Sequence, residues 1–426
     1  MENLILKEEV LHFIWKFGLS NKALYTSDGE FVEVISTGQH NLDAGPDFQG
    51  SKVRIGNTLW VGNVEIHIKS SDWHAHSHDK DQSYNNIILH VVYKHNREIY
   101  RKEGTRITTL ELKNYIDEKF IDNYATLLRK EMLSCRNILP EFLPVIKYGW
   151  LEKLAISRFE LKCKDIEEEL DYTGNNWEKT FFTILCKCFG LKVNSVAFEH
   201  LSRLVSLNTL AKHKDKHFQI EALFFGQAGL LEEDKECDYY KRLKKEYQFL
   251  RSKYDLKEIN KHEWKFMRMR PQSFPTIRLA FMSNLVYRST HMFRKCMNVA
   301  TADELVQLLD CEASEYWNTH YSFDKASKKK KKSLGIATRY IIIINGILPV
   351  MFLYGKKKAI PEFCEKAINL MQELPAEKNR IVNMYKDIDV KAYNALHSQA
   401  LLHLYKEYCT KKKCLECQFG LQTLIS

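Results

Sequence analysis

Two hydrophobic periodicities divide the chain near residue 113. In the first part, apolar and polar residues alternate in short runs, and this period of two predicts strands with one buried face. Within the longest run, Gly56 and Asn57 form a pair typical of a tight hairpin turn. A helical stripe of apolar residues at positions 4–17 predicts a first helix that ends at Gly18. The strand patterns occupy residues 30–37, 51–68, 87–95 and 99–115.

From about residue 114, apolar residues recur at helical spacing in long segments, and few strand patterns remain. We therefore expect an α+β protein, with a mixed α/β module and a small sheet in residues 1–113 and a mainly helical domain in residues 114–426. The most apolar run, Tyr340–Gly355, has 16 residues and contains Asn345, Gly346 and Pro349. A membrane span needs about 20 residues, so this run predicts a buried helix or helix pair.

Composition fits a folded, soluble protein. Of 426 residues, 45% are hydrophobic and 28% charged, which is enough apolar material for a core. The formal charge of +10 makes a polyanionic partner such as nucleic acid plausible. The acidic N-terminal segment does not resemble a secretory signal, and eleven cysteines without such a signal suggest a reducing cytoplasm. We expect a cytoplasmic protein without a membrane segment.

Strand phase gathers candidate catalytic groups on one face. Alternate side chains of a strand share a face, so Glu65, His67 and Lys69 point together. The turn Gly45-Pro46 precedes Asp47, which a hairpin can bring beside Glu65. Two neighbouring carboxylates repel each other and favour a hard cation such as Mg²⁺ or Mn²⁺. His67 or Lys69 could then orient a water molecule, or the carboxylates could simply belong to a half-exposed structural strand.

This arrangement resembles the PD-(D/E)xK nuclease core, in which an acidic helix precedes a hairpin that carries both motif halves. Pro46-Asp47 matches the first half. The second half departs from the pattern, because His67 stands where lysine is usual and the lysine follows at position 69. The resemblance implies a restriction-endonuclease-like module, with Glu9 of the first helix completing the site.

A competing site lies just downstream, where His74, His76 and His78 alternate among acidic residues. Imidazole and carboxylate together suit Zn²⁺, Mn²⁺ or Fe²⁺. In a helix these positions diverge, so a three-histidine site needs a looping backbone. The alternative is that His74 and His78 line the cleft beside Glu65 as contacts for nucleic-acid phosphates.

Two further groups suggest ligands. Cys409, Cys414 and Cys417 could hold Zn²⁺ with a fourth ligand, or an iron–sulfur cluster with a distant cysteine such as Cys135, or could be ordinary thiols. A proline-containing segment carries three arginines that could bind phosphates or cap helix ends. These are Arg268, Arg270 and Arg278.

Several long motifs occur in the order of a known family. They include GPDF, GNVEIHIKSSDWHAHSHDKDQSYNNIILHVVY, LFFGQAGLL, WKFMRMRPQSFPTIRLA and the cysteine-containing tail. Together they resemble, over essentially the whole chain, the uncharacterised bacterial family called domain of unknown function 2851, common in Bacteroidetes. The family brings no established activity.

Three functions are compatible with these patterns. The favoured hypothesis is a metal-dependent nuclease with a PD-(D/E)xK-like site. The alternatives are a non-catalytic scaffold that binds nucleic acid or protein, and a metal-dependent hydrolase of small substrates built on the histidines. The patterns do not separate DNA from RNA as a substrate, and they leave the oligomeric state open.

Overall fold

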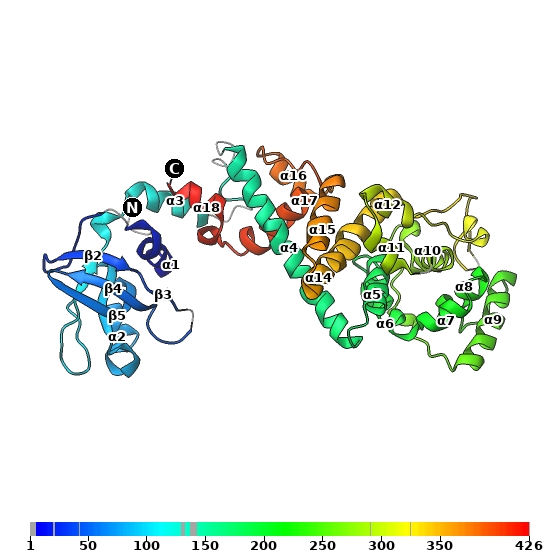
Figure 1. Ribbon diagram of the computed structural model, residues 1–426, viewed down its shortest axis with the longest axis horizontal. Helices are drawn as coiled ribbons and strands as arrows, with labels where there is room; N and C mark the ends of the chain where they lie inside the picture. The colour runs from blue at the N-terminus through cyan, green and yellow to red at the C-terminus, as the bar shows by residue number, and fades with distance from the viewer. Residues whose placement is uncertain are drawn as a thin grey trace. The chain divides into compact units, whose positions relative to one another are not determined.

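The chain folds into two compact units (Figure 1). The computed structural model describes residues 6–19, 22–41, 43–128, 133–136, 143–289, 291–323 and 325–425. Unit 1 contains Met1–Phe142 and Tyr405–Ser426, and unit 2 contains Leu143–Leu404. An N-terminal mixed sheet followed by a large helical region confirms the predicted α+β class.

Unit 1 is built on a seven-stranded mixed sheet in the order β1-β2-β4-β5-β6-β7, with β3 paired to β4. The strands from β1 to β5 pair antiparallel, whereas β5, β6 and β7 are parallel to one another. The strands are β1 Leu24–Tyr25, β2 Phe31–Ser36, β3 Gln39–His40, β4 Phe48–Ile55, β5 Thr58–Lys69, β6 Ile87–Lys94 and β7 Thr109–Glu111.

The β4–β5 hairpin turns at the predicted Gly56-Asn57 pair, where Ile55 faces Thr58. Gly56 has a φ of +56°, which a side chain would strain. At the far end of the hairpin Phe48 faces Val64. The register therefore brings Asp47, the residue before β4, next to Glu65, the residue after Val64.

Short helices surround this sheet. Helix α1 lies against β5, and the crossover from β5 to β6 carries α2, η2 and η3. Near the C-terminus, α18 packs on α3, and Leu424 enters the same apolar core as β4 to β7 (Figure 1). The bounds are α1 Glu8–Phe13, η1 Ile14–Gly18, α2 Asp72–Ala75, η2 His78–Lys80, η3 Gln82–Tyr84, η4 Lys113–Tyr115, α3 Glu118–Leu128, η10 Leu404–Cys409, η11 Cys414–Glu416 and α18 Gln418–Ile425.

The boundary between the two compact units does not fall after residue 113, where the sequence pattern changes. Helix α3 and the last 22 residues, 405–426, belong with the sheet, because their apolar side chains pack into its core. The first helical segment is also shorter as an α-helix than predicted: α1 ends at Phe13 and continues as the π-helical turn η1 to Gly18.

Unit 2 is helical apart from a two-stranded ribbon. Its elements are α4 Pro144–Tyr172, α5 Trp177–Phe189, α6 Ser195–Leu204, α7 Leu207–Lys212, α8 His217–Gln227, α9 Asp238–Tyr254, η6 Lys261–Glu263, η7 Pro271–Ser273, α10 Pro275–Arg288, α11 Met292–Asn298, α12 Ala302–Leu308, η8 Glu315–Asn318, β8 His320–Ser322, β9 Lys325–Ala326, α13 Ile336–Ile342, η9 Ile343–Ile347, α14 Leu348–Lys358, α15 Pro361–Glu373, α16 Arg380–Lys386 and α17 Ala395–His403.

The most apolar run forms one continuous helix from α13 through the π-helical turn η9 into α14. The π turn precedes Pro349, which has no backbone N–H to donate. Lys162 donates to the Ile344 carbonyl and the Asn345 side chain within that turn. By length and composition Ile336–Lys358 could cross a membrane, but 61% of its most apolar window is buried inside the protein, as in a core helix.

Candidate metal centre

Asp47 and Glu65 meet at the open end of the β4–β5 hairpin. The Asp47 backbone N–H donates to Glu65 Oε2 over 3.1 Å, and the Ile66 N–H donates to Asp47 Oδ2 over 2.9 Å. Each carboxylate thus accepts a hydrogen bond from a backbone N–H at or next to the other residue. These two bonds fix both side chains. Glu65 is only 5% exposed. Burial raises the pKa of Glu65, and the nearby Asp47 charge raises it further.

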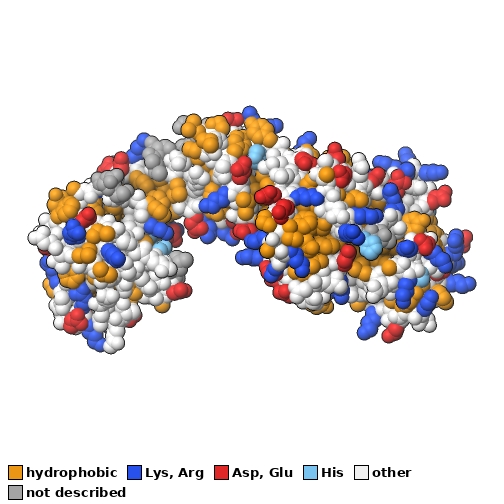
Figure 2. Space-filling model, viewed as in Figure 1, with side chains coloured by type: hydrophobic (Ala, Val, Ile, Leu, Met, Phe, Trp, Pro, Cys, Tyr) orange, Lys and Arg blue, Asp and Glu red, His pale blue; other side chains and the backbone are white. Residues whose placement is uncertain are grey.

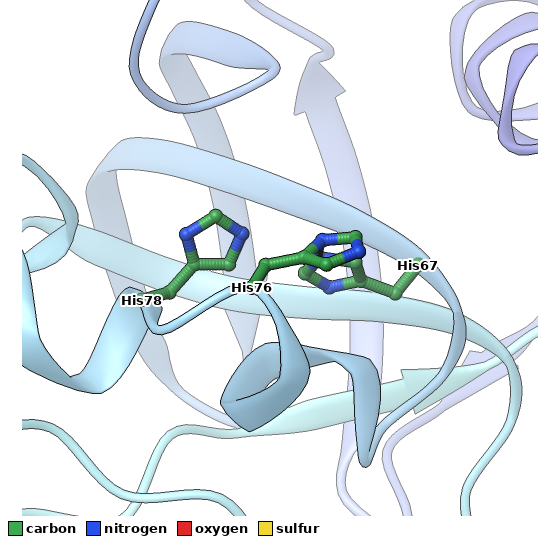
Figure 3. A group of neighbouring side chains, drawn as sticks. All are labelled: His67, His76 and His78. Carbon is green, nitrogen blue, oxygen red and sulfur yellow. Dashed lines mark hydrogen bonds between the residues drawn. The ribbon is translucent and has the colours of Figure 1, made fainter.

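Two imidazoles, those of His67 and His78, lie near the other oxygen of Glu65, and His76 forms a group with these two histidines (Figure 3). His67 Nε2 lies 3.7 Å and His78 Nε2 3.2 Å from Glu65 Oε1. His67 Nε2 also lies 3.1 Å from His76 Nδ1. One ligand atom from each histidine lies within 4.8 Å of the others, and this is the one such group of three among the residues described in the structure.

The crossover loops in the way that a three-histidine site requires. Helix α2 ends at Ala75, and Ser77 then takes a left-handed conformation with a φ of 63°. This turn lets His76 and His78, which would diverge on a helix, face the same point above β5 (Figure 3). The His78 ring is held in place by stacking on Tyr84, with ring centroids 3.9 Å apart.

His90 supports His67 from the neighbouring strand β6. It faces Glu65 in the parallel register, is fully buried, and places Nε2 2.8 Å from His67 Nδ1. Burial, reinforced by the neighbouring histidines, lowers the pKa of His67 to about 3 and that of His90 well below its usual value. Both rings are therefore neutral at physiological pH. A neutral His67 that donates from Nδ1 to His90 leaves Nε2 as a lone pair directed at the three-histidine group.

Helix α1 contributes a histidine and an acid that sequence reasoning did not select. His12 Nε2 lies 3.2 Å from Asp47 Oδ2. Glu8, one turn earlier, is partly buried and interacts electrostatically with Asp47, His12 and His76. Glu9, which was predicted to complete the site, is exposed and interacts with Tyr124 instead. The i, i+4 spacing of Glu8 and His12 was the available signal.

The spacing of these groups fits a bound metal ion. Ligand bonds of about 2.1 Å place neighbouring ligand atoms about 3.0–3.4 Å apart in octahedral or tetrahedral sites. The observed separations of 3.1, 3.2 and 3.7 Å around His67 and Glu65 fall close to that range. The buried His78 Nε2 faces Glu65 Oε1 at 3.2 Å, and a cation bound between them would replace this direct contact. Imidazole and carboxylate are together donors that suit a transition-metal dication.

Other predicted site residues lie outside this group. Lys69 shares the strand face of Glu65 but is exposed at the end of β5, and its side chain forms no ion pair with Asp47 or Glu65 in the described part of the chain. His74 Nδ1 faces Asp79 at 3.8 Å, away from the three-histidine group. His78, predicted as a phosphate contact, instead belongs to the group.

The three arginines lie in unit 2. Arg268 and Arg270 are exposed in the segment before η7. Arg278 is 5% exposed on α10, and burial lowers the pKa of its guanidinium to about 10. Its position in the helical core makes Arg278 unsuitable as a contact to nucleic acid, which corrects that prediction. On the visible face of the molecule, Lys and Arg are dispersed among acidic and apolar side chains (Figure 2).

The tail cysteines belong to unit 1. Cys409, Cys414 and Cys417 line one cavity together with Cys135, the fourth cysteine considered from the sequence.

Fold and site together define an α+β protein whose mixed sheet carries a buried cluster of carboxylates and imidazoles. The chain belongs to the family described as "Protein of unknown function (DUF2851)", which matches residues 8–380. This range contains every member of the cluster but ends before the three tail cysteines, so it is shorter than the whole-chain resemblance that was expected. No curated protein and no solved structure matches the chain.

Proposed function

We propose that unit 1 is a metal-dependent phosphodiesterase that acts on nucleic acid. The observation that carries this proposal is the group of three histidine ligand atoms within 4.8 Å of one another, with Glu65 Oε1 3.2 Å from His78 Nε2 and 3.7 Å from His67 Nε2. The Ile66 N–H of the Glu65 strand donates to Asp47, and Glu8 of α1 interacts electrostatically with Asp47; both contacts support a PD-(D/E)xK-like site, with Glu8 in place of the expected Glu9. His67 occupies the position where that motif usually has lysine.

The donor set supports a transition-metal dication, Mn²⁺ or Zn²⁺, in preference to Mg²⁺. The three imidazole nitrogens are borderline donors that suit Mn²⁺ or Zn²⁺, and they outnumber the one hard carboxylate oxygen, whereas Mg²⁺ is bound mainly by oxygen. The proposed ligands are Glu65 Oε1, His67 Nε2, His76 Nδ1 and His78 Nε2. A dication bound there would polarise a phosphodiester and lower the pKa of a bound water.

Asp47 has a different role in this proposal. Its Oδ2 accepts from the Ile66 N–H and lies against His12, so we assign it to positioning His12. Burial tends to lower the pKa of His12, but the hydrogen bond and charge of Asp47 outweigh it and raise that pKa. A histidine that keeps its proton near neutrality can donate it to the leaving oxygen of a cleaved phosphodiester.

Two observations support a polymeric substrate. His76 is exposed, so the ligand group opens to solvent at that side and is not enclosed in a pocket for a small molecule. The formal charge of +10 favours association of the whole chain with polyanions, and this charge resides in unit 2, because unit 1 has 21 Lys and Arg against 22 Asp and Glu. The three-histidine group would equally serve a hydrolase of small phosphoesters, and this is the second candidate function.

Cleavage of labelled single-stranded DNA, duplex DNA and RNA with added Mn²⁺, Zn²⁺ or Mg²⁺ tests the proposal. Glu65→Gln removes the one charged ligand, so cleavage should fall by at least about 100-fold, since loss of a mere supporting partner of a ligand costs about 10- to 100-fold. His74→Gln is the matched control, because His74 lies on the same crossover but outside the group.

Three outcomes separate the candidate functions. Metal-dependent cleavage that survives Glu65→Gln would refute the assignment. Cleavage of bis-p-nitrophenyl phosphate without cleavage of any polymer would favour the small-substrate hydrolase. Nucleic-acid binding without cleavage under all three metals would favour a non-catalytic scaffold.

A further inference from the structure

Four cysteines from distant parts of the chain line one cavity in unit 1. Cys135 follows α3, whereas Cys409, Cys414 and Cys417 belong to the C-terminal segment. The packing of α18 on α3 brings these segments together (Figure 1). The cavity contains none of the histidines of the metal centre in its lining, which is completed by Leu127, two lysines, Ser134, Tyr408 and Gly420.

The C-terminal segment places its three cysteines at the ends of short helical elements. Cys409 ends the π-helical turn η10, Cys414 begins η11, and Cys417 stands immediately before α18. Burial raises the pKa of the Cys417 thiol to about 12, while the nearby backbone N–H groups of Gly420 and Phe419 lower it and so favour the thiolate. Amide donors directed at sulfur are a common support for metal-bound thiolates.

Gly420 allows this close arrangement. A Cβ at position 420 would lie 2.1 Å from the Cys414 carbonyl oxygen, so only glycine lets the first turn of α18 rest on the cysteine-containing turn. The cavity also contains positive charge, because Lys412 and Lys413 line it. Cationic side chains near the sulfurs would balance the net negative charge of a thiolate-bound metal centre.

We propose that these four cysteines are the ligands of an iron–sulfur cluster. The cluster joins the C-terminal segment to the end of α3 and so completes unit 1. Each cysteine loses its proton as it binds iron, so the cluster replaces four neighbouring thiols in one cavity by four iron-bound thiolates. The segments that it joins are 274 residues apart at Cys135 and Cys409, so closing this loop adds more to the stability than a local link would.

The spread of the sulfur atoms favours a cluster over a single zinc ion. Zn–S bonds of about 2.3 Å would place the sulfurs about 3.8 Å apart in a tetrahedron. Within the described residues, no three of the four sulfurs lie within 4.8 Å of one another, because the histidine group alone meets that limit. A cluster of several iron and sulfide ions is larger than one zinc ion, and because the cavity between the cysteines is only about 20 Å³, the cysteine segments would move apart to enclose it.

The full-length protein, purified without oxygen, tests this directly. Wild type should contain about four iron and four sulfide ions per chain if the cluster is of the [4Fe–4S] type, with visible absorption that dithionite bleaches. Cys135→Ser is the decisive variant, because three closely spaced cysteines can chelate iron in an unfolded peptide but only the folded unit adds Cys135. Cys364→Ser, a cysteine of unit 2, is the matched control.

Cys135→Ser should lose most of its iron and sulfide, and Cys364→Ser should keep both. If Cys135→Ser does not fold, the wild-type cluster is removed by oxidation and chelation and rebuilt with Fe²⁺ and sulfide. Hydrogen exchange of α18 amides should accelerate on removal and slow again on rebuilding. Wild type without iron and sulfide, one zinc ion in their place, or iron retained by a folded Cys135→Ser variant would each overturn the proposal.

Discussion

Replacing His90 with phenylalanine tests how the metal centre is organised without touching a ligand. His90 is fully buried on β6 and contacts His67 through the 2.8 Å hydrogen bond between their ring nitrogens. Phenylalanine keeps an aromatic ring at the site but removes the acceptor. In the metal-free protein, His67 can move its proton to Nε2 and donate it to His76 Nδ1, 3.1 Å away, so this state recovers a hydrogen bond and loses less than the metal-bound state.

In the metal-bound state, the proton of His67 cannot move to the other ring nitrogen. There, Nε2 of His67 must be the lone pair, so the Nδ1 proton is left buried without an acceptor. An unsatisfied buried donor costs about 1–3 kcal/mol, and at about 1.4 kcal/mol per factor of ten this weakens metal binding about 5- to 150-fold. The range agrees with the effect of about 10- to 100-fold that supporting residues of metal ligands usually have.

Competition of the protein with a chromophoric chelator for Zn²⁺ or Mn²⁺ measures the effect. We expect His90→Phe to bind 5- to 150-fold more weakly on the estimate of about 1–3 kcal/mol, and His74→Gln to stay close to wild type. A His90→Phe protein that is folded and binds metal with unchanged affinity would refute the role of His90. Equal weakening in His74→Gln would point to a general loss of structure.

Further predictions concern stability. Metal-free protein should lose stability as pH falls from the unfolded-chain pKa of 6.5 towards the folded value of about 3 for His67, since the unfolded chain takes up protons that the native chain excludes. His90→Phe should reduce this slope by about 1.4 kcal/mol per pH unit, and an unchanged slope in hydrogen exchange of β5 amides would contradict the buried neutral state. Asp47→Ala leaves the Ile66 N–H without its acceptor and should destabilise unit 1 by about 1–3 kcal/mol in the same assay, whereas Asp47→Asn should cost clearly less; equal losses would count against this bond. Gly226→Ala places a Cβ 2.1 Å from a tyrosine ring and should destabilise unit 2 by about 1–3 kcal/mol in urea unfolding, while Gly149→Ala, with nothing within 4 Å, should not; equal effects would contradict the close packing.

Strand periodicity predicted β2, β4, β5 and β6, but it missed the short β1 and β3, and within 99–115 only Thr109–Glu111 forms a strand. The Gly56-Asn57 turn sets the register of the hairpin, and the register brings Asp47 beside Glu65, as the alternation of side chains indicated. The apolar run of residues 87–95 correctly predicted a buried strand. A histidine within that run was the visible sign of His90, but a single buried histidine in an apolar strand does not reveal its partner.

The rest of the site depends on tertiary geometry that local patterns do not specify. Ser77 has no residue-type signal for its left-handed conformation, yet this conformation turns His76 and His78 to the same point. The choice between Glu8 and Glu9 depends on the rotation of a short helix against β5, which six residues define poorly. The approach of Cys135 to the tail likewise follows from the packing of α18 on α3.

Anomalous scattering from crystals grown with Mn²⁺ or Zn²⁺ tests the central claim most directly. The account predicts one strong peak at bonding distance, about 2.0–2.2 Å, from His67 Nε2, His76 Nδ1, His78 Nε2 and Glu65 Oε1. The same data should show His90 hydrogen-bonded to His67 and Asp47 hydrogen-bonded to Ile66 and His12. A metal bound elsewhere in unit 1, or the four groups bonded to one another without an ion at saturating metal, would contradict it.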